Sequence, residues 1–253
     1  MRFASLGSGS SGNATVIQTS QTAVMLDCGF SCKETVNRLQ RLNLDPTSID
    51  AIIVTHEHND HLSGVGTFSR KFKVPVWMNL GTYRARKIGT LTELNLFNSH
   101  QEFVINGLKL KPFVVPHDSQ EAVQFIFSDQ QKKLAIVTDL GHITPHIISV
   151  LKDLNAIIIE ANHDYDMLWA GSYRHSLKQR VSGNFGHLNN HQAARLIAQL
   201  DTQSLQYLIA AHLSGENNTI AKTKAAFTQV LGSLPSHFEV ANQSAGFDWK
   251  VIS

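Results

Sequence analysis

The sequence predicts an α/β fold in which β-strands alternate with α-helices along 253 residues. Short apolar runs rich in β-branched residues recur along the chain, and stretches with helical spacing separate many of them. Histidine or carboxylate side chains follow several of these runs directly, and open α/β sheets build binding sites at such strand ends. Because no linker, repeat or low-complexity segment divides the chain, we expect a single domain over residues 1–253.

The composition is that of an ordinary globular protein, with 42% hydrophobic and 17% charged residues. A net charge of +2 neither indicates nor opposes a nucleic-acid partner. Cys28 and Cys32 are too few for a disulfide framework, so we expect reduced thiols and a cytoplasmic location. No secretory leader is visible, and no stretch approaches the roughly 18 apolar residues of a membrane span, so we expect no membrane partner.

A glycine- and serine-rich loop at residues 7–13 follows the first predicted strand. It lacks the Lys-Ser/Thr ending of a P-loop and precedes a strand, so we expect a structural turn beside the site. The predicted strands of the first half are residues 2–6, 14–17, 23–27, 51–54 and 75–78, and the predicted helices are residues 33–42, 62–72 and 82–88.

In the second half, Asn106-Gly107 between two apolar runs is a strong hairpin signal. Residues 164–186 form the least regular stretch of the chain. The predicted strands are residues 103–105, 108–115, 122–127, 134–137, 156–159 and 205–210, with two more near 238–240 and 247–249. The predicted helices are residues 145–151, one that residues 186–190 open, and residues 220–231.

The most informative segment is Thr-His-Glu-His-Asn-Asp-His at residues 55–61, directly after an apolar run. His56 and His58 are two positions apart, so on an extended backbone their side chains project to the same side and can hold one ion. Asp60 and His61 follow after a turn and can serve a second ion, or a water between the two. Imidazole and carboxylate ligands suit zinc, manganese or iron. A histidine-rich surface loop is the alternative interpretation.

Further candidates stand where later predicted strands end. His117, Asp139, Glu160 and His212 each follow an apolar run. One such histidine is more often an ordinary loop or core residue, but recurrence at successive strand ends favours a shared site. Asp27 also ends an apolar run and is either an acceptor behind a ligand histidine or a turn residue.

The Thr-His-x-His-x-Asp-His segment after a strand resembles the signature of the metallo-β-lactamase superfamily of hydrolases. The resemblance implies a metallo-β-lactamase-like four-layer αββα sandwich. It also implies two divalent metal ions, zinc or manganese, and a water that Asp60 orients. In the superfamily's order, one ion is held by His56, His58 and His117, the other by Asp60, His61 and His212, and Asp139 bridges the two.

A closer resemblance extends over nearly the whole chain. Gly-Ser-Gly-Ser-Ser-Gly-Asn at residues 7–13, Asp-Cys-Gly at 27–29, Glu-Ala-Asn-His-Asp at 160–164, Leu-Lys-Gln-Arg at 177–180 and Gly-His-Leu at 186–188 resemble the YycJ/WalJ (VicX) branch. That branch has DNA exonuclease activity. The resemblance therefore implies a metal-dependent phosphodiesterase acting on nucleic acid, with DNA ends as the substrate.

His187 is the main candidate outside the histidine cluster. It resembles a histidine of the related ribonuclease Z group that acts with a glutamate from an earlier strand end, which corresponds to Glu160. The resemblance implies that His187 donates a proton to the leaving oxygen while Glu160 holds it in position. The alternative is a polar residue at a helix start with no catalytic role.

Two other functions remain open from the sequence. An ester or thioester hydrolase similar to glyoxalase II or lactonases would use the same metals on a carbonyl group. A metal-bearing regulatory domain with little catalysis is disfavoured by the complete ligand set. The aromatic and basic residues within 165–180 suit stacking on bases and pairing with phosphates, or else they belong to a surface loop over the sheet edge.

Overall fold

The computed structural model describes residues 1–130 and 132–253, and most strands of the model coincide with apolar runs of the sequence. The strands of the first sheet are β1 (Arg2–Gly7), β2 (Ala14–Gln18), β3 (Ala23–Leu26), β4 (Ala51–Ile53), β5 (Val76–Met78), β6 (Leu94–Leu96) and β14 (Phe247–Val251). Those of the second sheet are β7 (Phe103–Ile105), β8 (Leu108–Val114), β9 (Val123–Asp129), β10 (Lys132–Val137), β11 (Ala156–Glu160), β12 (Tyr207–Ala211) and β13 (Phe238–Val240).

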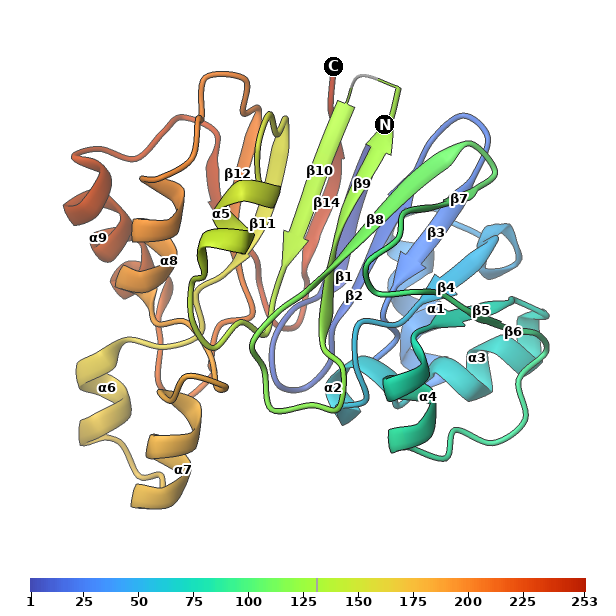
Figure 1. Cartoon of the computed structure of the whole chain (residues 1–253), viewed down its shortest axis with the longest axis horizontal. Helices are drawn as coiled ribbons and strands as arrows, with labels where there is room; N and C mark the ends of the chain where they lie inside the picture. Colours follow the sequence, from blue (N-terminus) through green and yellow to red (C-terminus); the bar gives the residue numbers. More distant parts are fainter. Residues whose placement is uncertain (131) are drawn as a thin grey trace.

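Helices connect these strands. They are α1 (Cys32–Arg41), α2 (Asn59–Leu62), α3 (Val65–Phe72), α4 (Leu80–Ala85), α5 (Pro145–Val150), α6 (Tyr165–Ala170), α7 (His175–Val181), α8 (Asn190–Ile197) and α9 (Ile220–Leu231), with a 3₁₀ turn at Pro46–Ser48. Figure 1 shows the two sheets packed face to face with helices on both outer sides. The predicted four-layer αββα sandwich is therefore confirmed.

Three apolar clusters hold these layers together. Between the sheets, Phe3, Phe125 and Ile209 are fully buried with their neighbours. On the outer face of the first sheet, Phe68 of α3 packs with strand residues and α1. On the outer face of the second sheet, Phe227 of α9 packs with residues of α5 and α8. Burial of a side chain of this size stabilises the fold by about 1.5–3 kcal/mol.

The sheet topology brings distant strand ends to one edge of the sandwich. The first sheet has the order β14-β1-β2-β3-β4-β5-β6, and β3, β4 and β5 run parallel. The second has the order β13-β12-β11-β10-β9-β8-β7, and β10, β11 and β12 run parallel. The residues that follow these parallel strands include most of the candidates from the sequence.

The predicted helix at residues 62–72 is wrong in its extent. In the structure α2 ends at Leu62 and α3 begins at Val65. Ser63 and Gly64 separate the two helices, and the backbone of Gly64 passes close to that of Phe30. A Cβ at Gly64 would lie 2.0 Å from the Phe30 carbonyl oxygen. The interruption gives Asp60 and His61 a short helix of their own.

The prediction that residues 164–186 are irregular is also wrong. Asp164 caps α6 by accepting a hydrogen bond from the Met167 amide, and α7 follows. The two helices project from the lower edge of the sandwich in Figure 1. His187 stands in the loop before α8, because that helix begins at Asn190 after a capping box formed by Asn189 and Gln192.

Gly29 fixes where α2 lies against the loop that follows β3. The Cys28 amide donates to the His61 carbonyl, and the Asn13 amide donates to the Asp60 carbonyl. A Cβ at Gly29 would lie 1.7 Å from that Asp60 carbonyl oxygen. The α2 backbone could not approach so closely if residue 29 had a side chain.

We therefore expect Gly29→Ala to lower the free energy of unfolding by about 1–3 kcal/mol, because the new methyl group must displace α2. Urea denaturation measures this change. Gly215→Ala is the matched control, since nothing lies within 4 Å of a Cβ there, and its effect should stay within about 0.5 kcal/mol. Equal stabilities of the two variants would contradict the packing argument.

Candidate metal centre

The residues that the sequence nominates as metal ligands lie together at the edge of the sandwich where the parallel strands end. They form two groups, and within each group one nitrogen or oxygen atom per residue lies within 4.8 Å of the others. The first group is His56, His58 and His117, and the second is Asp60, His61, Asp139 and His212.

In the first group, hydrogen bonds on the far side of two rings decide which nitrogen faces the centre. His117 Nδ1 donates to the Gly186 carbonyl at 3.0 Å, and His58 Nε2 donates to the Asp118 carbonyl at 3.2 Å. The remaining nitrogens, His117 Nε2 and His58 Nδ1, then face each other as lone pairs 3.2 Å apart. Two lone pairs at that distance repel each other unless a cation lies between them.

His56 presents a third nitrogen in the same way. The Thr55 hydroxyl donates to the Asp27 carboxylate at 2.9 Å, so it accepts from His56 Nδ1 at 2.9 Å. His56 Nε2 is buried and has no hydrogen-bond partner among the described residues. Burial and the neighbouring histidines hold the pKa of His56 well below its usual value, so the ring is neutral. Three imidazole nitrogens that converge in this way suit a divalent ion.

The second group places imidazoles among carboxylates. His61 Nδ1 donates to Asp27 Oδ2 at 2.8 Å, which turns His61 Nε2 toward Asp139 Oδ2 at 3.0 Å. His212 Nδ1 donates to Glu160 at 2.9 Å, which turns His212 Nε2 toward Asp60 Oδ2 at 3.5 Å. The role of Asp27 as an acceptor behind a ligand histidine is thus the one the geometry supports.

This second group requires positive charge. Burial alone would lower the pKa of His212, but the carboxylates of Asp139, Asp60 and Glu160 raise it to about 10. Burial opposes protonation of His61 too, yet Asp139, Asp60 and Asp27 raise its pKa well above the usual value. A divalent ion would supply that charge in place of the protons.

Asp139 belongs to the second group and also lies near the first. Its Oδ2 lies 3.0 Å from His61 Nε2, and its Oδ1 lies 3.8 Å from His117 Nε2. The backbone φ of Asp139 is 53°, and Asp27 and His212 have φ of 60° and 56°. Non-glycine residues seldom adopt this left-handed conformation, and it recurs here at three strand ends that supply the site.

Sequence reasoning missed Asn13 as a member of the site. Its side-chain amide donates to Asp60 Oδ2 at 3.1 Å and to the Gly9 carbonyl at 3.1 Å, and the Gly9 amide donates back to Asn13 Oδ1 at 2.8 Å. The Ser8 hydroxyl accepts from the His212 amide at 2.9 Å. The glycine- and serine-rich loop is therefore a structural support beside the site, as its sequence predicts.

Glu160 joins the second group to His187. Its Oε1 accepts from His187 Nδ1 at 2.7 Å and from His212 Nδ1, while its Oε2 accepts from the amides of Leu140 and Leu188 at 2.9 and 3.0 Å. Burial alone would raise the pKa of Glu160, but the two histidines lower it to about 2. Burial disfavours a charged His187, and the Glu160 carboxylate outweighs it and raises the His187 pKa. Asp139, Glu160, His187 and His212 also form a third cluster that could hold an ion.

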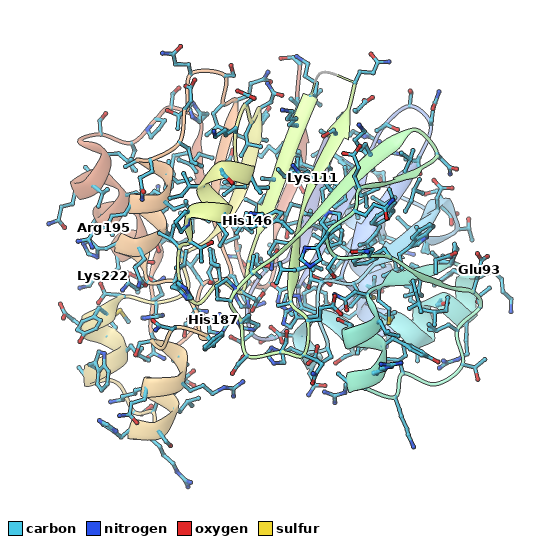
Figure 2. All side chains as sticks on the ribbon, viewed as in Figure 1. Glu93, Lys111, His146, His187, Arg195 and Lys222 are labelled. Atoms are coloured by element: carbon cyan, nitrogen blue, oxygen red, sulfur yellow. The ribbon has the colours of Figure 1, made fainter. Side chains whose placement is uncertain are left out.

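An open cleft of about 360 Å³ runs over the two groups, and Figure 2 shows His187 at the same edge of the sandwich. Arg180 of α7 forms an ion pair with Asp118, whose carboxylate lies 3.5 Å from His117 Nε2. Sequence reasoning did not predict this contact between α7 and the first group. The cleft is lined by His58, Asp60, Asp139, His187 and His212 together with Ser10, Asn59, Arg86, Asp118, Tyr173, Leu177, Arg180, Val181 and Gly186.

His163, Asp164 and His175 are not among the residues that line this cleft in the described chain. His163 is fully buried, Asp164 caps α6 and lies 3.5 Å from Lys222, and His175 packs against Trp169. Within the described residues, no helix is both long and apolar enough to cross a membrane.

Comparisons of the sequence with a family model and with known proteins agree on one family. Residues 22–212 match the model of the β-lactamase superfamily domain. The chain is 33% identical to exodeoxyribonuclease YycJ of Bacillus anthracis over 91% of this chain and 89% of that one. It is 30% identical to exodeoxyribonuclease WalJ of Streptococcus pneumoniae serotype 2 over 99% of this chain and 93% of that one.

Solved structures share the fold. The zinc-bound PqqB of Methylobacterium extorquens superposes with a TM-score of 0.77 at 13% identity, over 99% of this chain and 100% of that one. The match of more than half the chain to the family model and the two relatives agree with the buried histidine and aspartate clusters. The chain therefore belongs to the metallo-β-lactamase superfamily of metal-dependent hydrolases, in the group that contains YycJ and WalJ.

Proposed function

We propose that the protein is a dinuclear metal-dependent phosphodiesterase that removes nucleotides from DNA ends. The observation that carries this proposal is the pair of adjacent ligand groups, with Asp139 of the second group 3.8 Å from His117 of the first, next to a His187 held by Glu160. Relatives that are named exodeoxyribonucleases, and that the chain matches over 89% and 93% of their length, support the choice of DNA. In this proposal residues 1–253 act as one domain, and the free thiols of Cys28 and Cys32 fit a cytoplasmic enzyme.

The proposed ligands are those that the superfamily resemblance implies. His56, His58 and His117 would hold one ion, zinc or manganese, Asp60, His61 and His212 would hold the other, and Asp139 would serve both. Such a pair of ions supplies Lewis-acid stabilisation of the phosphoryl charge and activates the attacking water. Asp60 is 21% exposed and fixed by Asn13, so its carboxylate can orient that water and accept its proton.

His187 is the proposed donor to the leaving oxygen. Its Nδ1 donates a hydrogen bond to the ionised Glu160 carboxylate. His187 lines the cleft, so Nε2 is the nitrogen that can donate to a substrate there. The Glu160 carboxylate raises the pKa of His187 and so favours a second proton, on Nε2. A departing sugar oxygen needs such a proton, because an alkoxide is a poor leaving group.

The α6–α7 pair is the proposed contact for the nucleic-acid strand. Tyr173, Leu177 and Arg180 line the cleft, and Tyr165 is 53% exposed on α6. Aromatic and cationic groups arranged beside a cleft can stack on bases and pair with phosphates.

Purified protein should contain two divalent ions per chain, about 3.5–4 Å apart if they act together. Elemental analysis by plasma mass spectrometry measures the stoichiometry. His117→Ala should reduce it toward one, whereas His100→Ala changes an exposed histidine outside both groups and should leave it at two. A fully loaded wild-type chain with a single ion would contradict the dinuclear proposal.

Replacing His187 by alanine should lower kcat on DNA by about 10²–10⁴-fold with little change in metal content. The loss should be smaller on a p-nitrophenyl phosphodiester, whose leaving group departs without a proton. His146→Ala, a change of an exposed histidine, is the control. An equal loss on both substrates would reject the proton-donor role, and loss of metal would indicate that His187 is a ligand.

The substrate class is tested by supplying linear duplex DNA or the thioester S-lactoylglutathione to the metal-loaded enzyme. We expect release of nucleotides from DNA ends, where a proton from His187 assists the poor leaving group, and no hydrolysis of the thioester. The Asp139→Asn variant should lose the activity, which excludes a contaminating nuclease. Thioester hydrolysis with intact DNA would overturn the assignment.

A further inference from the structure

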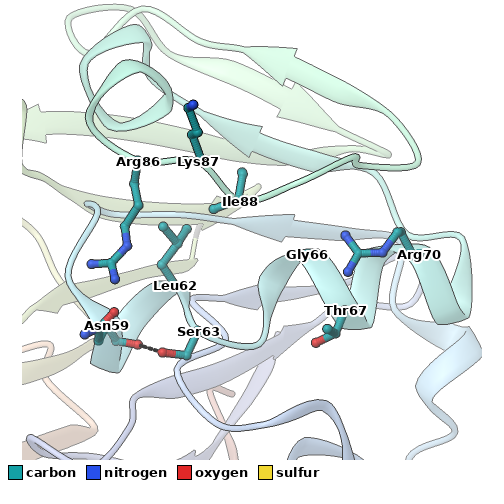
Figure 3. A pocket seen from close by; sticks show the side chains of 9 residues that line it. All are labelled: Asn59, Leu62, Ser63, Gly66, Thr67, Arg70, Arg86, Lys87 and Ile88. Atoms are coloured by element: carbon teal, nitrogen blue, oxygen red, sulfur yellow. Dashed lines mark hydrogen bonds between the residues drawn. The ribbon is translucent and has the colours of Figure 1, made fainter.

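A second pocket lies next to the proposed catalytic cleft, on the side away from α7. Figure 3 shows it between α3 and the segment that follows α4, and its volume is about 310 Å³. Asn59 and Arg86 line both this pocket and the cleft. The residues that line it are Asn59, Leu62, Ser63, Gly66, Thr67, Arg70, Arg86, Lys87 and Ile88.

The lining is cationic. It includes Arg70, Arg86 and Lys87 and no acidic residue. Among the residues that the structure describes, none of these three forms an ion pair within 4.0 Å. Arg180 and Arg41, in contrast, are paired with Asp118 and Asp248. The pocket thus presents positive charge that the protein itself does not neutralise.

A hydrogen bond holds one of the two arginines in position. Arg70 Nη1 donates to the Thr90 carbonyl at 2.7 Å, which anchors the guanidinium and leaves its other N–H groups for a ligand. Figure 3 shows the Arg86 guanidinium near Asn59 and the Arg70 guanidinium at the opposite end, with Leu62 and Ile88 between them. Lys87 points away from the other labelled side chains.

The pocket depends on a close approach of two backbones. A Cβ at Gly66 would lie 2.4 Å from the Ile88 carbonyl oxygen, so glycine at this position lets the 86–90 segment lie against α3. The short helix α2 is the wall that the pocket shares with the metal centre. Asn59 and Leu62 of this helix line the pocket, while Asp60 and His61 belong to the second ligand group.

We propose that this pocket binds a phosphate group of the same DNA strand, beyond the bond being cleaved. The inference rests on the proposed function and adds the direction in which the strand continues, from the cleft past Arg86 to Arg70. Guanidinium groups at both ends suit phosphate oxygens, and Leu62 and Ile88 suit the apolar face of a sugar or base. A volume at the lower end of the range of small-ligand pockets, about 300–1,000 Å³, suits a single strand.

The pocket should make the enzyme sensitive to substrate length. For the wild type, kcat/KM should be higher on a 12-nucleotide single strand than on a dinucleotide, which cannot reach Arg70. Arg70→Gln should lower the ratio of kcat/KM on the 12-nucleotide strand to kcat/KM on the dinucleotide roughly tenfold, because the contact between the Arg70 guanidinium and a phosphate is lost. Thr67→Glu is a second variant, since its carboxylate, three residues before Arg70 on α3, would pair with the guanidinium and neutralise it, and it should act in the same direction. Lys71→Gln is the matched control, because Lys71 is the next cation on α3 and is not part of the lining.

Binding is measured separately with the metal-loaded enzyme and a 12-nucleotide strand whose linkages are phosphorothioates that resist hydrolysis. The slope of log Kd against log salt should decrease in magnitude by about 0.7 in Arg70→Gln, as expected for one lost contact to a single strand. If the wild type digests DNA and both pocket variants keep the length preference and salt slope of Lys71→Gln, the pocket inference fails alone. If Arg70→Gln weakens the binding of inorganic phosphate but not the binding of the strand, the pocket binds a free anion and the inference is overturned.

The two proposals fail in different ways. A wild type that releases no nucleotides from DNA disproves the proposed function. The phosphorothioate strand then reports on the pocket by itself, since its binding does not require hydrolysis. Arg70-independent binding of that strand disproves the pocket inference whatever the activity.

Discussion

The structure depends on how buried carboxylates and imidazoles are kept together at one edge of the sandwich. Asp27, Asp139 and Glu160 are almost completely buried, and an isolated buried carboxylate costs far more than folding can provide. Asp27 and Glu160 accept hydrogen bonds from histidines, whereas Asp139 Oδ2 lies 3.0 Å from His61 Nε2 and has no hydrogen-bond partner among the described residues. The cluster is therefore stable only with positive charge in its centre, which protons on His61 and His212 supply in part and divalent ions would supply fully.

The fold provides this cluster through its parallel strands. Strands β3 and β4 of one sheet and β10, β11 and β12 of the other deliver side chains from the same edge, so residues far apart in the sequence meet there. The left-handed backbone at Asp27, Asp139 and His212 redirects the chain directly after a strand. Such strain is tolerated because the surrounding hydrogen bonds fix each residue in place.

Much of this arrangement could be predicted from the sequence. The apolar runs predicted most strands, the helix at residues 220–231 was predicted to the residue, and the spacing within residues 55–61 indicated a metal site. The contacts of Asn13 with Asp60 and of Arg180 with Asp118 could not be predicted, because they join residues 47 and 62 positions apart through tertiary packing. Helices α6 and α7 are too short to give a clear apolar period, and their starts depend on local capping and turn geometry.

The most direct test of the account is a crystal structure of the metal-loaded protein with anomalous scattering data collected at the metal absorption edges. The account predicts two anomalous peaks, one among His56, His58 and His117 and the other among Asp60, His61 and His212, with Asp139 between them. A single peak, or a peak bound by Glu160 and His187 in place of the first group, would contradict it.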